Sequence, residues 1–183
     1  KKEKITDFKT AISSTVRSLS NSEKIEVYFG NDSSKSERNS IRLPELSAIN
    51  KKLNYNQIRA MADSKSLRHR FSDPKTFKQY EPDGNISKQL YRISEKIRCE
   101  KIGTSYFKGV KNNIETFYQE RVSGLDLKSS EDKIVESFEN YFRIKFLDFK
   151  NNSQLDKKLK SYKADLNEKF KDKIVQLNDL TLD

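Results

Sequence analysis

The stretch from Asn85 to Tyr118, NISKQLYRISEKIRCEKIGTSYFKGVKNNIETFY, decides the fold because it carries the clearest helical periodicity in the chain. Four apolar residues recur at the three- and four-residue steps that place side chains in one stripe of an α-helix: Ile86, Leu90, Ile93 and Ile97. A second set repeats these steps on a neighbouring face: Tyr91, Glu95, Arg98 and Ile102. We therefore expect a helix that is packed on two sides, with a Glu–Arg pair inside the packing.

Two glycines of this stretch are expected to lie at helix boundaries. Gly103 is predicted to be the left-handed residue that ends the helix, and Gly109 precedes the next helical pattern. Glu95 and Arg98 lie three residues apart, so we interpret them as a structural pair that fixes the register of neighbouring helices, with an interface role as the alternative. Cys99 is expected to be a small buried hydrophobe, and Glu100 is expected to be exposed on the third face.

Composition limits the class of protein. With 183 residues, of which 33% are hydrophobic and 35% charged, the chain is long enough for one substantial core or two small ones. No run of about 18 apolar residues and no signal-peptide pattern occurs, so we expect a cytoplasmic protein without a membrane span. One cysteine and one histidine are too few for a disulfide framework or a structural zinc site. The first residue is Lys1 and the only methionine is Met61, which indicates a segment of a longer chain.

The formal net charge of +10 would attract a polyanion. Lysine and arginine are interleaved with acidic residues along the whole chain, which is typical of a solvated surface. A basic helical module that binds nucleic acid remains the alternative function, but no recognition-helix or RNA-binding motif accompanies the charge.

The periodicities predict a mainly α (α+β) fold. In the first half, residues 5–19 form an amphipathic helix, and alternation over 25–29 predicts a strand whose antiparallel partner is 41–43. A helix over 58–71 ends before Pro74, which begins a short helix capped by Ser72 or Asp73.

In the second half, Ser129 or Ser130 is expected to cap the most aromatic helix, which extends to about Phe149. A long helix begins near Ser153 and either stands alone or pairs with its predecessor in a hairpin. We predict a multi-helix domain with a small two-stranded β-ribbon over residues 1–124, and a carboxy-terminal helical hairpin or extension over 125–183.

Sequence motifs predict no catalytic, cofactor or metal site. The segment Gly30–Ser36 resembles a phosphate-binding loop, but Ser34 stands where that motif needs the glycine before lysine. Neither Asp63–Ser66 nor Asp126–Ser130 has the Asp-x-Ser-x-Ser spacing of a metal-adhesion site. His69 lies between two arginines near a predicted helix end, and we interpret it as a surface residue that stabilises that end.

Several short sequence motifs occur once each along the chain, in a specific order. They are Arg42-Leu43-Pro44-Glu45-Leu46, Ala62-Asp63-Ser64 with Leu67-Arg68, Pro82-x-Gly84, Glu95-x-x-Arg98-x-Glu100-x-x-Gly103 and Gly109-Val110-x-x-Asn113. This ordered set resembles the amino-terminal region of the CobT subunit of aerobic cobaltochelatase. The resemblance covers residues 5–118 well, and the remaining helices only in pattern.

The resemblance implies membership of a three-part, ATP-dependent complex that inserts Co²⁺ into hydrogenobyrinic acid a,c-diamide during cobalamin biosynthesis. The implied partners are an AAA+ ATPase subunit, which uses ATP and Mg²⁺, and a large subunit that holds the macrocycle. An acidic segment of the chain itself is a third implied partner. The resemblance implies a scaffold without catalytic residues, and its structural or interface residues are Asp63, Ser64, Arg68, Glu95, Arg98, Glu100 and Gly103.

Overall fold

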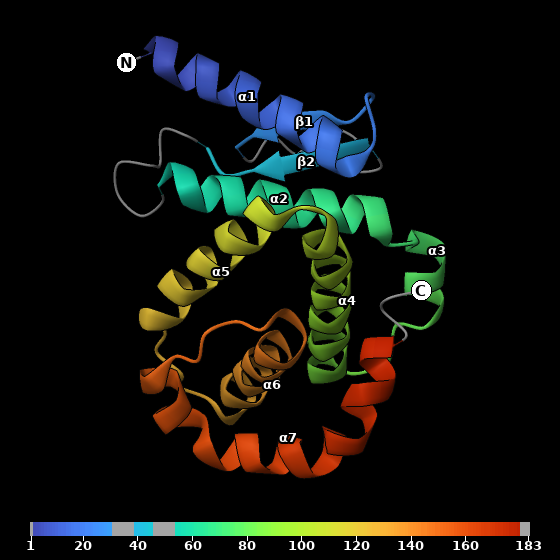
Figure 1. Cartoon of the computed structure of the whole chain (residues 1–183), viewed down its shortest axis with the longest axis vertical. Helices are drawn as coiled ribbons and strands as arrows, with labels where there is room; N and C mark the ends of the chain where they lie inside the picture. The colour runs from blue at the N-terminus through green and yellow to red at the C-terminus, as the bar shows by residue number, and fades with distance from the viewer. Residues whose placement is uncertain (1, 31–38, 46–53, 180–183) are drawn as a thin grey trace.

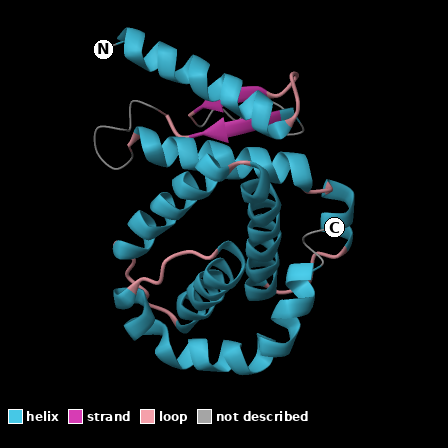
Figure 2. Ribbon diagram, viewed as in Figure 1, coloured by secondary structure: helices cyan, strands magenta, loops and turns pink. Residues whose placement is uncertain are grey.

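The computed structural model describes residues 2–30, 39–45 and 54–179, and this part of the chain is mainly helical (Figures 1 and 2). Its elements, in chain order, are α1 (Lys2–Ser20), β1 (Glu26–Phe29), β2 (Ser40–Leu43), α2 (Tyr55–Phe71), α3 (Pro74–Gln79), α4 (Asn85–Tyr106), α5 (Lys108–Ser123), α6 (Ser130–Leu147) and α7 (Ser153–Asp179). The predicted fold class is confirmed, including the ribbon near the N-terminus and the long C-terminal helix. None of these helices is both long enough and apolar enough to cross a bilayer.

Helix α2 lies between two hydrophobic cores. Helix α1 and the ribbon cover one side of α2, and α4 and α5 pack against the other side (Figure 1). The smaller core is formed by Ile12, Val16, Ile25, Ile41, Leu43, Ile58 and Ala62. Leu67, near the other end of α2, belongs instead to the larger core, which is built from α4, α5, α6 and α7. One helix therefore connects both halves of the structure.

The two strands of the ribbon run parallel, so the predicted antiparallel pairing is wrong. Val27 pairs with Ile41 and Phe29 pairs with Leu43. Parallel pairing requires the chain to return to the start of the neighbouring strand, which a tight hairpin turn cannot do. This arrangement buries Ile41 and Leu43 in the core beside α2. Residues 31–36 of the segment compared with a phosphate-binding loop lie outside the described residues.

Gly103 lies inside α4 and does not end it, which corrects the predicted helix boundary. The helix continues to Tyr106, where Phe107 forms the C-cap. Gly103 is buried, and a Cβ atom added to it would lie 2.2 Å from Cδ2 of Leu67. The missing side chain therefore allows α4 to approach α2 closely.

The predicted caps of two later helices are confirmed. Asp73 accepts hydrogen bonds from the backbone N–H groups of Lys75 and Thr76, and Pro74 is the first residue of α3. Ser129 forms a capping box with Asp132 at the start of α6. Helix α7 curves around the side of α6 that faces away from α2 (Figure 1) and packs against it. A domain boundary near residue 124 stays a prediction.

Two glycine substitutions should change the free energy of unfolding in opposite directions, because Gly103 is in close contact with a neighbouring helix and Gly109 is not. Gly103→Ala places a methyl group against the fully buried Leu67 and should lower the free energy of unfolding by about 1–3 kcal/mol. Gly109→Ala is the matched control, because a Cβ at Gly109 meets no atom within 4 Å and its helix position suits alanine. Urea denaturation of both variants is the measurement. Equal destabilisation by the two changes would contradict the proposed role of Gly103.

Candidate functional site

A buried arginine on α6 forms the centre of a network of charged side chains. The Arg143 side chain is 2% exposed, and its Nη1 donates to Oε2 of Glu100 at 2.6 Å while its Nε donates to Oε1 of Glu139 at 2.8 Å. The Glu100 side chain is fully buried on α4. Burial alone would lower the pKa of Arg143, but the two carboxylates outweigh burial and raise it. Arg143 therefore keeps its charge inside the protein.

The network continues onto α5 through Arg121. Its guanidinium group donates to both oxygens of Glu136, at 2.9 and 3.0 Å, and to Oε2 of Glu139 at 3.0 Å. The Tyr118 hydroxyl also donates to Glu136, at 3.1 Å. Burial raises the pKa of Tyr118, and the neighbouring Glu136 and Glu139 raise it further, so this hydroxyl keeps its proton and remains a donor.

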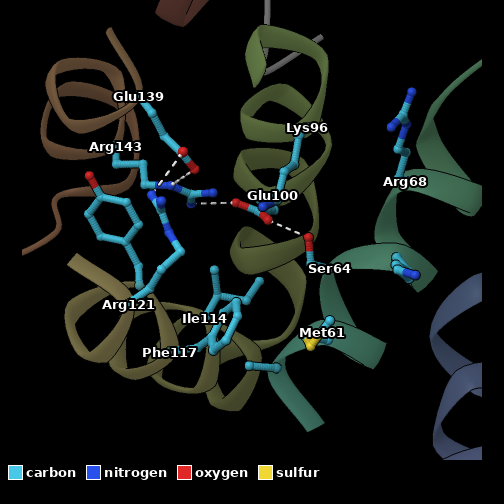
Figure 3. A pocket seen from close by; sticks show the side chains of 13 residues that line it. Met61, Ser64, Arg68, Lys96, Glu100, Ile114, Phe117, Arg121, Glu139 and Arg143 are labelled. Atoms are coloured by element: carbon cyan, nitrogen blue, oxygen red, sulfur yellow. Dashed lines mark hydrogen bonds and ion pairs between the residues drawn. The ribbon is translucent and has the colours of Figure 1, made fainter. Parts of the chain in front are cut away.

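Helix α2 joins the network through Ser64, whose hydroxyl donates to Oε1 of Glu100 at 2.5 Å. Figure 3 shows Glu100 pointing from α4 toward both Ser64 and Arg143. One carboxylate thus joins α2, α4 and α6, and Glu139 and Arg121 extend the connection to α5. The network fixes the mutual positions of four helices.

A hollow of about 410 Å³ lies beside this network (Figure 3). Glu100 and Arg143 belong to its lining, together with apolar side chains of Met61, Ile114 and Phe117. Further cationic side chains also line the hollow: Lys65, Arg68, Lys96 and Arg121. The volume lies in the range of small-molecule sites, about 300–1,000 Å³. The hollow thus combines an apolar wall with positive charge.

Four cations line this hollow or its neighbour without a salt bridge in the described part of the chain. The structure gives no ion pair with a described carboxylate for Arg42, Lys65, Arg68 or Lys96, which we call the basic rim. A second hollow, of about 890 Å³, shares Lys65 and Arg68 with the first and adds Arg42. Although Lys65 is exposed, partial desolvation in the hollow lowers its pKa, and the charges of Arg42 and Lys96 lower it further. Glu139 compensates part of this charge through Lys96, but Arg42, Lys65 and Arg68 remain without a carboxylate partner in the described part of the chain, so the rim favours an anionic ligand or partner.

The described residues offer neither a cluster of metal-binding side chains nor a reactive thiol. No group of three His, Cys, Asp or Glu side chains among them could hold a metal ion. Cys99 is fully buried, and burial, together with the nearby Glu95 carboxylate, raises the pKa of its thiol to about 12. The thiol is therefore not a nucleophile at neutral pH, and the predicted role of Cys99 as a buried hydrophobe is confirmed.

The sequence matches one family model along almost its whole length. A model described as cobalamin biosynthesis protein CobT matches residues 2–179. The chain belongs to the CobT family. This match extends through α6 and α7, beyond the part in which the sequence motifs carry the resemblance. It supports a role in cobalamin biosynthesis. No solved structure matches the chain.

The residues predicted from the CobT motifs do not form one site. Ser64, Arg68 and Glu100 line the first hollow, whereas Gly103 contacts Leu67 beneath it and Asp63 lies at a different hollow. The prediction that Glu100 is exposed is wrong, because α6 covers this face of α4 and supplies Arg143 as its partner.

The Glu95–Arg98 pair of this CobT-family chain has the predicted geometry. Nε and Nη2 of Arg98 donate to the two oxygens of Glu95 at 2.8 and 2.9 Å. Nη2 also donates to the carbonyl oxygen of Phe71 at 2.6 Å, at the last residue of α2. Burial would raise the pKa of Glu95, but hydrogen bonds from Arg98 and Ser72 outweigh it and lower the pKa. The pair therefore holds α4 against the end of α2.

His69 lies near the same end of α2. It is half-buried, and so less exposed than predicted.

The sequence analysis missed the residues of α5 and α6 that complete the network. A polar stripe in the otherwise aromatic α6 could have indicated them, because Glu136, Glu139, Asn140 and Arg143 recur at helical spacing. Charged residues at such spacing within an apolar helix indicate buried partners on another helix.

Arg143 and Arg92 differ in burial, so their substitution in this CobT-family domain should lower the free energy of unfolding by very different amounts. Arg143→Met leaves Glu100 and Glu139 buried without their main counter-charge and should lower the free energy of unfolding by about 3–5 kcal/mol. Arg92→Met is the control, since Arg92 forms a 2.9 Å pair with Glu81 but its side chain is 56% exposed. Its expected cost is at most about 1 kcal/mol. Guanidinium chloride unfolding measures both values, and similar costs would show that the buried network is not a structural determinant.

The network also predicts a dependence of stability on pH. Burial would raise the pKa of Glu139, but Arg143, Lys96 and Arg121 outweigh it and hold the pKa at about 2, below the ordinary value of 4.5. A lowered folded-state pKa means that the ionised carboxylate stabilises the fold above pH 4.5 and that this contribution disappears as the pH falls toward 2. The stability difference between wild type and Glu139→Gln should therefore shrink over this interval.

Glu131→Gln is the control for this experiment, because Glu131 is exposed in the first turn of the same helix. Thermal unfolding between neutral pH and the acid limit of folding gives both curves. A difference between wild type and Glu139→Gln that is constant with pH would contradict the assigned ionisation of Glu139.

Proposed function

We propose that this chain is the amino-terminal interaction domain of a CobT-like subunit of ATP-dependent cobaltochelatase. It acts in the cytoplasm as a scaffold that holds the catalytic partners in place. Family membership supports the pathway. The scaffold role is supported by the buried ion pairs that join α4, α5 and α6, and by the inert thiol of Cys99.

The proposed partners are the AAA+ ATPase subunit and the large subunit that holds the macrocycle. In the assembled enzyme, ATP and Mg²⁺ belong to the ATPase subunit, and Co²⁺ is inserted into hydrogenobyrinic acid a,c-diamide on the large subunit. The role of the present chain is to transmit movement between these partners. A packed helix held on two faces shifts as a unit, and α4 is held by Arg98 at α2 and by Glu100 at α6.

The observation that carries the docking proposal is the basic rim. Uncompensated cations at a surface hollow attract acidic groups, speed association and orient the partner. We expect the rim to receive acidic side chains of the ATPase subunit or an acidic segment that belongs to the same subunit. Lys65 and Arg68 are exposed and line both hollows, so they are the residues most available to such a partner.

Charge reversal at the rim tests this proposal. Lys65→Glu combined with Arg68→Glu should weaken binding of the ATPase subunit by at least about tenfold at low salt, with a slower association rate. Lys171→Glu combined with Lys173→Glu changes net charge equally on the exposed face of α7 and should leave the affinity unchanged. Surface plasmon resonance at two salt concentrations gives the rates and affinities.

Two outcomes would count against the proposal. Equal loss of binding in both double variants would mean that net charge, and not the rim, attracts the partner. Preferential binding of duplex DNA or RNA at the rim, with a steep dependence on salt, would favour the alternative of a nucleic-acid-binding module.

A further inference from the structure

Phe117 on α5 is an aromatic residue that the hydrophobic cores do not explain. Its side chain is half-buried, it belongs to neither core, and it is not one of the partly buried side chains that pack against them. It lines the hollow beside the ion network, together with Ile114 one turn earlier on the same helix (Figure 3). An aromatic ring that lines an open hollow offers apolar surface to a binding partner.

This hollow has an apolar part and a cationic part. Met61 of α2 and Phe117 of α5 belong to the apolar part. Lys65 and Arg68 follow Met61 on α2 by four and seven residues, which is roughly 6 and 10 Å along an α-helix. Figure 3 shows Lys96 and Arg68 at the end of the hollow away from Met61 and Phe117. A group that fits both parts is therefore apolar, with negative charge at this distance from it.

The cations continue beyond this hollow. Lys65 and Arg68 also line the second hollow, together with Arg42 of β2. Nζ of Lys65 donates to the carbonyl oxygen of Arg42 at 2.5 Å, so the two hollows meet at this side chain. A single carboxylate pairs with only part of this row of cations, whereas an extended peptide segment with several carboxylates pairs with all of it. Charge complementarity therefore favours an acidic segment of a protein partner.

We propose that the ATPase subunit reaches the basic rim with an acidic segment that carries one aromatic or large aliphatic side chain, the apolar anchor. The anchor inserts into the hollow and packs against Phe117 and Met61, while acidic residues two or three positions away pair with Lys65 and Arg68. Two or three residues of an extended segment span about 7–10 Å, which matches the spacing of Met61 from these cations.

This inference rests on the proposed function, because it takes the rim as the docking site, and it adds the contact that holds the partner there. Anchors that fill a pocket supply most of the binding energy of an interface, whereas exposed charges mainly speed association. The two contributions should therefore appear in different rate constants.

Phe117→Ser tests the anchor. The variant removes the apolar wall and keeps every charge, so the ATPase subunit should dissociate at least about tenfold faster, with an association rate within about twofold of wild type. This effect should persist at high salt. The effect of Lys65→Glu with Arg68→Glu on the association rate should shrink, because salt screens exposed charges. Surface plasmon resonance with the ATPase subunit as analyte gives both rate constants.

Tyr80→Ser is the matched control. It removes a ring that is 65% exposed at the end of α3 and lines neither hollow, so both rate constants should stay unchanged. Phe117→Lys gives a second comparison, because it adds a positive charge in place of the ring. A rim that acts by charge alone would then bind more tightly, whereas loss of the anchor contact speeds dissociation. Urea unfolding of each variant verifies that it folds, as expected for a residue outside both cores.

The outcomes separate this inference from the proposed function. If Phe117→Ser dissociates no faster while charge reversal at the rim still weakens binding, the anchor is wrong and the docking proposal stands. If the ATPase subunit does not bind, or charge reversal has no effect, both fail. Self-association of the chain that Phe117→Ser abolishes, measured by analytical ultracentrifugation without the ATPase subunit, would assign the hollow to a second copy and overturn the inference.

Discussion

The buried ion pair between Arg143 and Glu100 is the interaction on which the rest of the structure depends. Both side chains are almost completely removed from water, and their charges lie 2.6 Å apart. Such a pair is not a large source of stability in comparison with well-packed apolar residues, but removing either partner leaves a charge buried alone. It therefore acts mainly on specificity. Only the arrangement in which α6 lies against α4, with Ser64 of α2 within reach, satisfies all of these groups together.

Close packing of α2 and α4 makes this arrangement possible. Gly103 lets the backbone of α4 approach Leu67, and this contact lies one turn from Glu100 and its bond to Ser64. Helix α2 also contributes to the core beneath α1 and the ribbon, so a shift of α2 would disturb both cores. Consecutive residues of this helix face different hollows: Ser64 lines the one beside the network, and Asp63 lines the one beside α1 and α5.

The sequence predicts local features of this fold well and long-range features poorly, for physical reasons. Helical periodicity and side-chain caps are encoded within a few residues, so α1, α4 and the caps at Asp73 and Ser129 could be predicted. The partner of Glu100 lies 43 residues away on α6, and periodicity shows on which face a residue lies but not what covers that face. The direction of the ribbon depends in the same way on the path of the connection and on packing against α2. A C-cap glycine and a close-contact glycine look alike in sequence, which explains the error at Gly103.

The charges that the fold leaves unmatched indicate where binding energy is available. Arg143, Arg121 and the three glutamates of the network already satisfy one another, so a ligand gains little from them without first breaking existing bonds. The basic rim is different, because Arg42, Lys65 and Arg68 form no ion pair with a described carboxylate. A partner that supplies acidic groups gains their full interaction and reduces the repulsion between these cations. Recognition by this domain should therefore occur at the basic rim, while the network beside it keeps the helices fixed.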